Sequence, residues 1–240
     1  MSQPFSLYDK RHYSTVDVLT GYKKWSSTYD ETVDNQLDIS LLTNLKTVTW
    51  SKVNKVLDLG CGTGRIGKWL YNQGISNICG IDNCSAMLEH SALKNIYTKL
   101  NVAEMTQTSL LNCSYDLIVT SLAICHLPNL DALYTEVARI LKPGGLFILI
   151  DYHPFFLLQG IPTNFDENGK SIAIENFVHL FSDHINSGYC VNFTLLEMQE
   201  RIVDPAWVEQ RPGMEKYINQ PISFCMVWEN LDFVNSINFV

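Results

Sequence analysis

A cluster of glycines directly follows a short apolar run near residue 60. Residues 55–59 read Lys-Val-Leu-Asp-Leu, and residues 60–64 read Gly-Cys-Gly-Thr-Gly. Glycine lets the backbone turn tightly and approach a ligand closely, so the order strand, glycine loop, helix is a common device for binding nucleotide-like ligands. We therefore expect Asp58 and the loop 60–64 to belong to a binding site.

Three cofactors compete for a loop of this kind. A dinucleotide fingerprint, G-x-G-x-x-G, begins at Gly60, but Arg65 occupies the place of its third glycine. A P-loop, G-x-x-x-x-G-K-[ST], begins at Gly62, but Trp69 stands where a hydroxyl should bind magnesium. An acidic-x-G-x-G-x-G pattern is met without a break over residues 58–64.

The unbroken pattern resembles the cofactor motif of class I, Rossmann-like methyltransferases that use S-adenosylmethionine. A carboxylate at Asp58 suits a ligand that carries an ammonium and a sulfonium charge. Asp82 ends the next apolar run, 24 residues after Asp58. A carboxylate at that place can accept hydrogen bonds from both hydroxyls of a ribose.

The resemblance covers most of the chain. Residues 82–88 are similar to the family's second motif, and residues 101–104 to the segment that meets adenine. Residues 115–127 and 136–145 are similar to the fourth-strand motif, and to the helix and turn after it, in enzymes that act on small molecules. Residues 25–30 are similar to a lid whose tyrosine often touches the cofactor.

This resemblance implies a set of cofactor-binding residues and no metal. The set is Tyr29, Asp58, Gly60, Cys61, Gly62, Thr63, Gly64, Asp82, Asn83, Met87, Val102, Ala103, Glu104, Ser121, Leu122 and Ala123. Many relatives carry an aspartate where Val102 stands, so here we expect backbone groups of Val102 and Ala103 to read the adenine edge. Tyr29 as a lone aromatic residue is also compatible with a place in the core.

Methyl transfer from a sulfonium needs a nucleophile held at attack distance in a dry pocket. A neutral hydroxyl or an ammonium must also lose a proton, so a base near neutral pKa helps. His126 and His153 follow the fourth and fifth expected strands, where the reacting methyl group would lie. Each is a candidate base; packing near the cofactor for His126, and a turn before Pro154 for His153, are equally good interpretations.

Two absences and the charge favour a small-molecule acceptor. Residues 121–124 read Ser-Leu-Ala-Ile instead of the Asn/Asp-Pro-Pro-Tyr/Phe motif of enzymes that methylate nucleic-acid amino groups. Cys125 follows Ile124 and not the proline of cytosine-C5 enzymes. A net charge of -8 disfavours nucleic acid, because affinity for phosphates rests on Lys and Arg. Residues 155–184 are rich in Phe and Leu, which indicates either a substrate pocket wall or ordinary packing.

Alternating strands and helices must position these residues. Apolar, β-branched runs predict strands at 55–59, 78–81, 100–103, 115–121, 146–150, 195–202 and 223–228. Helical spacing predicts helices after the glycine loop and at 85–93, 130–141 and 182–192, with a turn at 142–145 and a hairpin tip at 166–170. The expected fold is α/β, a Rossmann-like, seven-stranded, mainly parallel sheet with helices on both faces, an N-terminal helical lid and an insertion after strand 5.

The 240 residues suit one domain. We divide it into a lid of helices and loops (1–48), a cofactor-binding core (49–154), a substrate-side insertion (155–192) and C-terminal strands (193–240). The seven cysteines include no C-x-x-C pair, so neither a disulfide framework nor a zinc site is expected. With no signal peptide and no spanning apolar run evident, we expect a cytoplasmic monomer or homodimer that does not bind membranes.

Two other functions remain open from the sequence. A regulatory protein could keep the cofactor fold without catalysis, although the intact loop and Asp82 argue against that. A protein or RNA methyltransferase is the other alternative.

Overall fold

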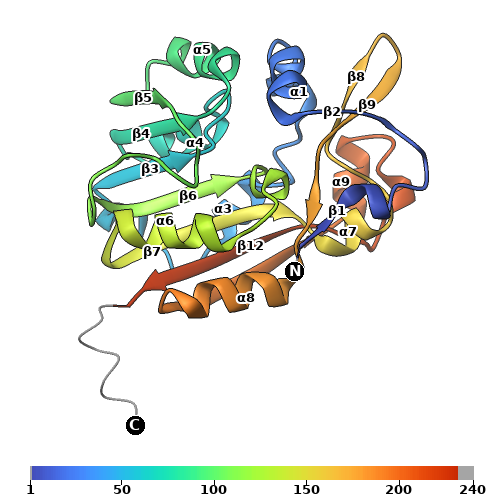
Figure 1. Cartoon of the computed structure of the whole chain (residues 1–240). Helices are drawn as coiled ribbons and strands as arrows, with labels where there is room; N and C mark the ends of the chain where they lie inside the picture. Colours follow the sequence, from blue (N-terminus) through green and yellow to red (C-terminus); the bar gives the residue numbers. More distant parts are fainter. Residues whose placement is uncertain (1, 232–240) are drawn as a thin grey trace.

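The computed structural model describes residues 2–231, and a seven-stranded sheet forms its centre (Figure 1). The strand order is β11-β12-β7-β6-β3-β4-β5. β3 to β7 run parallel, whereas β12 and β11 are antiparallel to their neighbours. The strands are β3 (Lys55–Leu59), β4 (Asn77–Asp82), β5 (Lys99–Val102), β6 (Tyr115–Ser121), β7 (Leu141–Tyr152), β11 (Phe193–Ile202) and β12 (Pro221–Asn230). The expected Rossmann-like, mainly parallel sheet is confirmed.

Helices cover both faces of this sheet because its central strands are apolar on both sides. Ile118 of β6 packs in a cluster with Leu133 and Val137 of α6. Its neighbours Leu117 and Val119 pack on the opposite face, in a cluster that includes residues of α3 and α4. Alternate residues of a strand face opposite sides, so a run that is buried on both faces reads as continuously apolar. The helices of the core are α3 (Ile39–Asn44), α4 (Arg65–Asn72), α5 (Ser85–Leu93), α6 (Asp131–Ile140) and α8 (Phe181–Cys190).

The turn expected at 142–145 lies inside a strand instead of before it. β7 begins at Leu141, which pairs with Tyr115, and the next paired residue is Leu146, opposite Leu117. The residues between them bulge out of the ladder, with Gly144 at φ +72°. A bulge keeps the strand continuous while it absorbs extra residues, so the start predicted at residue 146 was wrong by five residues.

The N-terminal segment and the insertion form one structure beside the carboxyl ends of the strands. β2 (Ser14–Val16) pairs in parallel with β9 (Lys170–Ile174), which pairs with β8 (Asn164–Glu167). The β8–β9 tip, Asn168 and Gly169, has positive φ at both residues, as expected for a hairpin at that place. Figure 1 shows α1 (Val18–Trp25) standing next to this hairpin. The lid therefore contains strands as well as the expected helices.

Short elements complete the chain. They are β1 (Gln3–Pro4), which pairs with β10 (Phe177–Val178), the helices α2 (Tyr29–Thr32), α7 (Pro154–Leu158) and α9 (Pro205–Gln210), and the 3-10 turns Phe5–Leu7, Trp50–Lys52, Ile124–His126 and Glu215–Tyr217. Over residues 2–231, no helix has the length and apolar character needed to cross a bilayer. Within the same residues, no group of three or more His, Cys, Asp or Glu side chains is placed to hold a metal ion.

Candidate active site

A cavity of about 410 Å³ opens at the carboxyl ends of β3, β4 and β6. Such a position, at the ends of parallel strands, is the usual ligand site of open α/β sheets. The lining includes these residues singled out from the sequence: Tyr29, Gly60, Gly62, Asp82, Asn83, Met87, Ala103, Glu104, Ser121, Leu122, Ala123 and His126. Residues that sequence reasoning missed are Val18, Tyr22, Ile81, Met105, Thr106, Leu127, Pro128, Asn129 and Ala132.

The glycine loop needs its glycines for conformation and for space. Gly60 and Gly62 have φ of +73° and +53°, a region that residues with side chains rarely adopt. A Cβ on Gly60 would lie 3.0 Å from Met105 Cε and 3.1 Å from Ala123 Cβ. The backbone N–H groups of Gly60 and Cys61 both donate to the Ile81 carbonyl, at 2.8 and 2.9 Å. The loop thus presents bare backbone to the cavity.

Asp82 joins this loop to the start of α5. One carboxylate oxygen accepts from the Gly62 N–H and the other from the Cys84 N–H, both at 2.8 Å. Burial raises the pKa of the Asp82 carboxyl, although the backbone N–H bonds oppose that rise. Each oxygen keeps a further lone pair, and Asp82 lines the cavity, so two ribose hydroxyls can be bound there. The bare loop and this carboxylate fit S-adenosylmethionine.

Asp58 is held under α4, away from the cavity lining. Its carboxylate accepts from the Tyr97 hydroxyl at 2.7 Å and from the Gly67 N–H. Burial raises the pKa of the Asp58 carboxyl to about 7, against these hydrogen bonds. Asp58 shares its strand face with Val56, which packs on the α3 and α4 side of the sheet. Asp58 therefore anchors the first turns of α4 after the glycine loop and does not line the cavity.

Four other residues of the expected set lie outside the lining. Cys61 is buried, Gly64 caps α4 at φ +86°, and Val102 is 62% exposed on the edge strand β5. The Thr63 hydroxyl donates to the Asp30 carboxylate, whose other oxygen accepts from Lys94 Nζ at 2.6 Å. Thr63 therefore ties the lid to the glycine loop.

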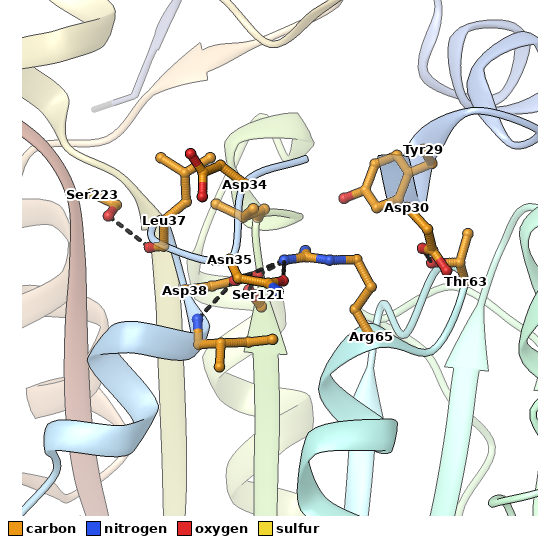
Figure 2. A network of polar contacts seen from close by, with 12 residues as sticks. Tyr29, Asp30, Asp34, Asn35, Leu37, Asp38, Thr63, Arg65, Ser121 and Ser223 are labelled. Carbon is orange, nitrogen blue, oxygen red and sulfur yellow. Dashed lines mark hydrogen bonds and ion pairs between the residues drawn. The ribbon is translucent and has the colours of Figure 1, made fainter. Parts of the chain in front are cut away.

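An ion pair is the second contact that joins the lid to the glycine loop (Figure 2). Arg65, the first residue of α4, donates to the two oxygens of Asp38 at 2.9 and 3.0 Å and to Asn35 at 2.8 Å. Asp38 also accepts from the Ser121 hydroxyl at 3.1 Å. These contacts fix the segment after α2, so that Tyr29 stays in the cavity wall.

His126 faces the cavity and has partners at both ring nitrogens. Nδ1 lies 2.6 Å from the Glu175 carbonyl, and Nε2 lies 2.8 Å from the Tyr22 hydroxyl. A carbonyl can only accept, so Nδ1 carries the proton and Nε2 accepts from Tyr22. Burial lowers the pKa of His126 to about 4, against the opposing bond to Glu175. The ring is therefore neutral at pH 7 and a weaker base than the near-neutral one expected from the sequence, with its unprotonated nitrogen toward Tyr22.

His153 lies elsewhere. Its Nδ1 accepts from the Phe155 N–H at 3.0 Å as the cap of α7, and its Nε2 lies 2.8 Å from Glu200 Oε1. The ring packs edge-on against Phe181, with centroids 5.0 Å apart. Of the two candidate bases, the structure brings only His126 to the cavity.

The insertion 155–192 contributes no residue to the described cavity lining. Phe165 stacks on Trp25 of α1, and Phe181 packs on Phe224 of β12. These two rings therefore serve packing, and the insertion contacts the site through the Glu175 carbonyl that orients His126.

Comparison with known proteins agrees with this geometry. Residues 57–149, which hold the loop, Asp82 and His126, match the family model described as a methyltransferase domain. A sterol 24-C-methyltransferase of Aspergillus fumigatus is 30% identical over 99 residues, 39% of this chain and 26% of that protein. A malonyl-[acyl-carrier protein] O-methyltransferase of Hahella chejuensis is 31% identical over 96 residues, 39% of this chain and 34% of that protein. The matched part spans about a quarter to a third of these relatives.

Solved structures share the fold over most of the chain. An S-adenosylmethionine-dependent methyltransferase from Mesorhizobium loti superposes with a TM-score of 0.66 at 20% identity, covering 81% of this chain and 97% of that one. The DhpI–SAH complex gives a TM-score of 0.62 at 15% identity, covering 88% and 94%. Residues 57–149 therefore carry a methyltransferase domain, on a fold shared with solved S-adenosylmethionine-dependent methyltransferases.

Proposed function

We propose that this protein transfers a methyl group from S-adenosylmethionine to a small-molecule acceptor. One observation carries the proposal: the same cavity is lined by the glycine loop, by Asp82 and by the neutral His126. The cofactor, when bound, supplies a methyl group on a sulfonium that is already activated for displacement. The protein must then orient the acceptor, exclude water and receive a proton.

Different cavity residues perform these tasks. Asp82 holds the ribose, and Met87, Ala103 and Glu104 form the adenine end. His126 receives the proton that the acceptor loses, since its basic nitrogen is directed to the cavity side through Tyr22.

The size and charge of the cavity support a small acceptor. A volume of about 410 Å³ is near the lower end of the range for ligand pockets, roughly 300–1,000 Å³, and the cofactor takes part of it. The described lining contains no Lys or Arg side chain, which a nucleic-acid backbone would require. The relatives named for sterol and malonyl-[acyl-carrier protein] show that this domain type occurs with different acceptors.

A transfer assay tests the proposal. The protein is incubated with S-adenosylmethionine and a panel of phenols, amines, carboxylates and thiols, and demethylated cofactor and methylated product are measured. His126→Ala should lower kcat at least about tenfold on any acceptor that loses a proton. His90→Ala, on α5 and outside the cavity lining, is the matched control and should keep kcat. Full activity of His126→Ala would refute the role of this base.

A further inference from the structure

Tyr22 and His126 both line the cavity, and the Tyr22 hydroxyl covers the unprotonated nitrogen of His126. Tyr22 lies on α1, and its ring meets the His126 ring edge-on with centroids 5.3 Å apart. On its other side the Tyr22 ring is stacked on Trp25 at 6.0 Å. The lone pair of His126 Nε2 is already occupied by the Tyr22 hydroxyl. A proton leaving an acceptor therefore reaches His126 through Tyr22.

The direction of the hydrogen bonds fixes what Tyr22 offers to a ligand. The His126 Nδ1–H donates to the Glu175 carbonyl, so the single hydroxyl hydrogen of Tyr22 points at Nε2. The lone pairs of the Tyr22 oxygen remain for another donor. Tyr22 thus selects an acceptor that donates a hydrogen bond from its reacting atom.

The other residues that line the cavity indicate the polarity and charge of the rest of that acceptor. Val18, Met105, Leu127, Pro128 and Ala132 supply apolar surface. The ionisable carboxylates of the lining are Asp82 and Glu104, at the end assigned to the cofactor, and no lining cation faces them. A carboxylate or phosphate group would be buried there without a partner, which costs several kcal/mol. An uncharged, apolar acceptor fits these walls.

We propose that Tyr22 is a catalytic residue that takes the proton of a small acceptor with a phenolic or enolic hydroxyl. This inference rests on the proposed function and narrows its acceptor. The proton ends on His126, whose pKa burial lowers to about 4, so a hydroxyl that is already acidic, such as that of a phenol or an enol, gives up its proton to this pair most readily. An aliphatic alcohol is a far weaker acid than either.

The proton and electron balance is complete without another reagent. The bond from the acceptor oxygen to the methyl carbon forms as the bond from that carbon to sulfur breaks, and the electron pair of the broken bond stays on sulfur. The acceptor proton moves to the Tyr22 oxygen, and the Tyr22 proton moves to His126 Nε2. His126 keeps its Nδ1–H bond to Glu175 and then releases the proton to water.

Tyr22→Phe tests the inference because it keeps the ring and its stacking on Trp25 but removes the hydroxyl. The probes are phenol, 4-nitrophenol, benzylamine and benzoate, with kcat measured for each and binding of S-adenosylhomocysteine measured by calorimetry. The matched control is Tyr189→Phe, since Tyr189 is 81% exposed on α8. We expect methylation of the two phenols and not of benzoate or benzylamine.

Tyr22→Phe should lower kcat on phenol at least about tenfold. With both assays run at about pH 8.5, it should lower kcat much less on 4-nitrophenol, which is ionised at that pH and needs no proton receiver, whereas phenol is not. Binding of S-adenosylhomocysteine should stay within about twofold, a split that a merely structural role would not give. Two results for Tyr22→Phe would overturn this inference: an equal loss of kcat on both phenols, or an unchanged kcat on phenol. The inference also fails if the wild-type protein binds S-adenosylhomocysteine but methylates neither phenol. If the wild-type protein does not bind S-adenosylhomocysteine, the proposed function itself is overturned.

Discussion

Removing Arg65 should destabilise the protein strongly because it leaves Asp38 buried without its cation. The Asp38 side chain is 1% exposed and that of Arg65 10% exposed, with 2.9 Å between the charged atoms. Arg65→Met keeps most of the aliphatic stem but leaves the carboxylate only the Ser121 hydroxyl and the Ile39 N–H. Breaking a buried pair at one partner costs about 3–5 kcal/mol, so Tm should fall by roughly 6–20 °C for a chain of this size.

Circular dichroism during thermal and urea unfolding measures this effect. Lys24→Met is the control, because the Lys24–Glu167 pair is also short, at 3.0 Å, but 44% and 39% exposed. An exposed pair contributes at most about 1 kcal/mol. Adding Asp38→Asn to Arg65→Met should recover much of the loss, since no buried charge then remains. A loss below about 1 kcal/mol for Arg65→Met, or no recovery in the double variant, would refute the reasoning.

Two further predictions concern the support of the glycine loop. Burial raises the pKa of the Asp58 carboxyl to about 7 in the folded state, whereas an unfolded aspartate loses its proton near pH 4. The contribution of this group to the stability of the fold is therefore fully present below about pH 4 and is lost as pH rises through about 7. Asp58→Asn should therefore gain stability relative to wild type as pH rises across that window, and parallel curves in urea melts at each pH would contradict this. Gly67→Ala should destabilise by about 1–3 kcal/mol despite the better helix propensity of alanine, because its Cβ would collide with the Tyr97 hydroxyl. Tyr97→Phe should relieve part of that loss in the double variant, and a stabilised Gly67→Ala protein would show the collision to be wrong.

The sheet could be predicted from the sequence because its central strands are buried on both faces. The runs 55–59 and 115–121 are strands with those bounds. Asp82 was found for a similar reason, since a carboxylate at a strand end next to a glycine loop is a local pattern. The orientation of Asp58 could also have been predicted, because alternate residues of a strand face the same side and Asp58 therefore shares the face of Val56, away from the cavity.

The lid was less predictable because long-range contacts form it. The pairing of β2 with β9 joins residues more than 150 positions apart, and nothing local in either segment indicates it. The ion pair of Arg65 with Asp38 joins the glycine loop to the lid in the same way. Tyr22 did carry a signal: with Trp25 and Tyr29 it forms an aromatic stripe at helical spacing, a pattern that more often indicates core packing.

Calorimetric titration with S-adenosylhomocysteine tests the central claim, that the glycine loop and Asp82 hold the cofactor. Wild-type protein should bind it with a Kd below roughly 1 mM. Asp82→Asn should weaken binding by about 10- to 100-fold, the effect of losing charged hydrogen bonds to the ribose. Asp116→Asn, at the opposite end of β6 in an ion pair with Lys142, should bind as the wild type does. Absence of binding to the wild-type protein, or equal affinity of Asp82→Asn and wild type, would contradict the account.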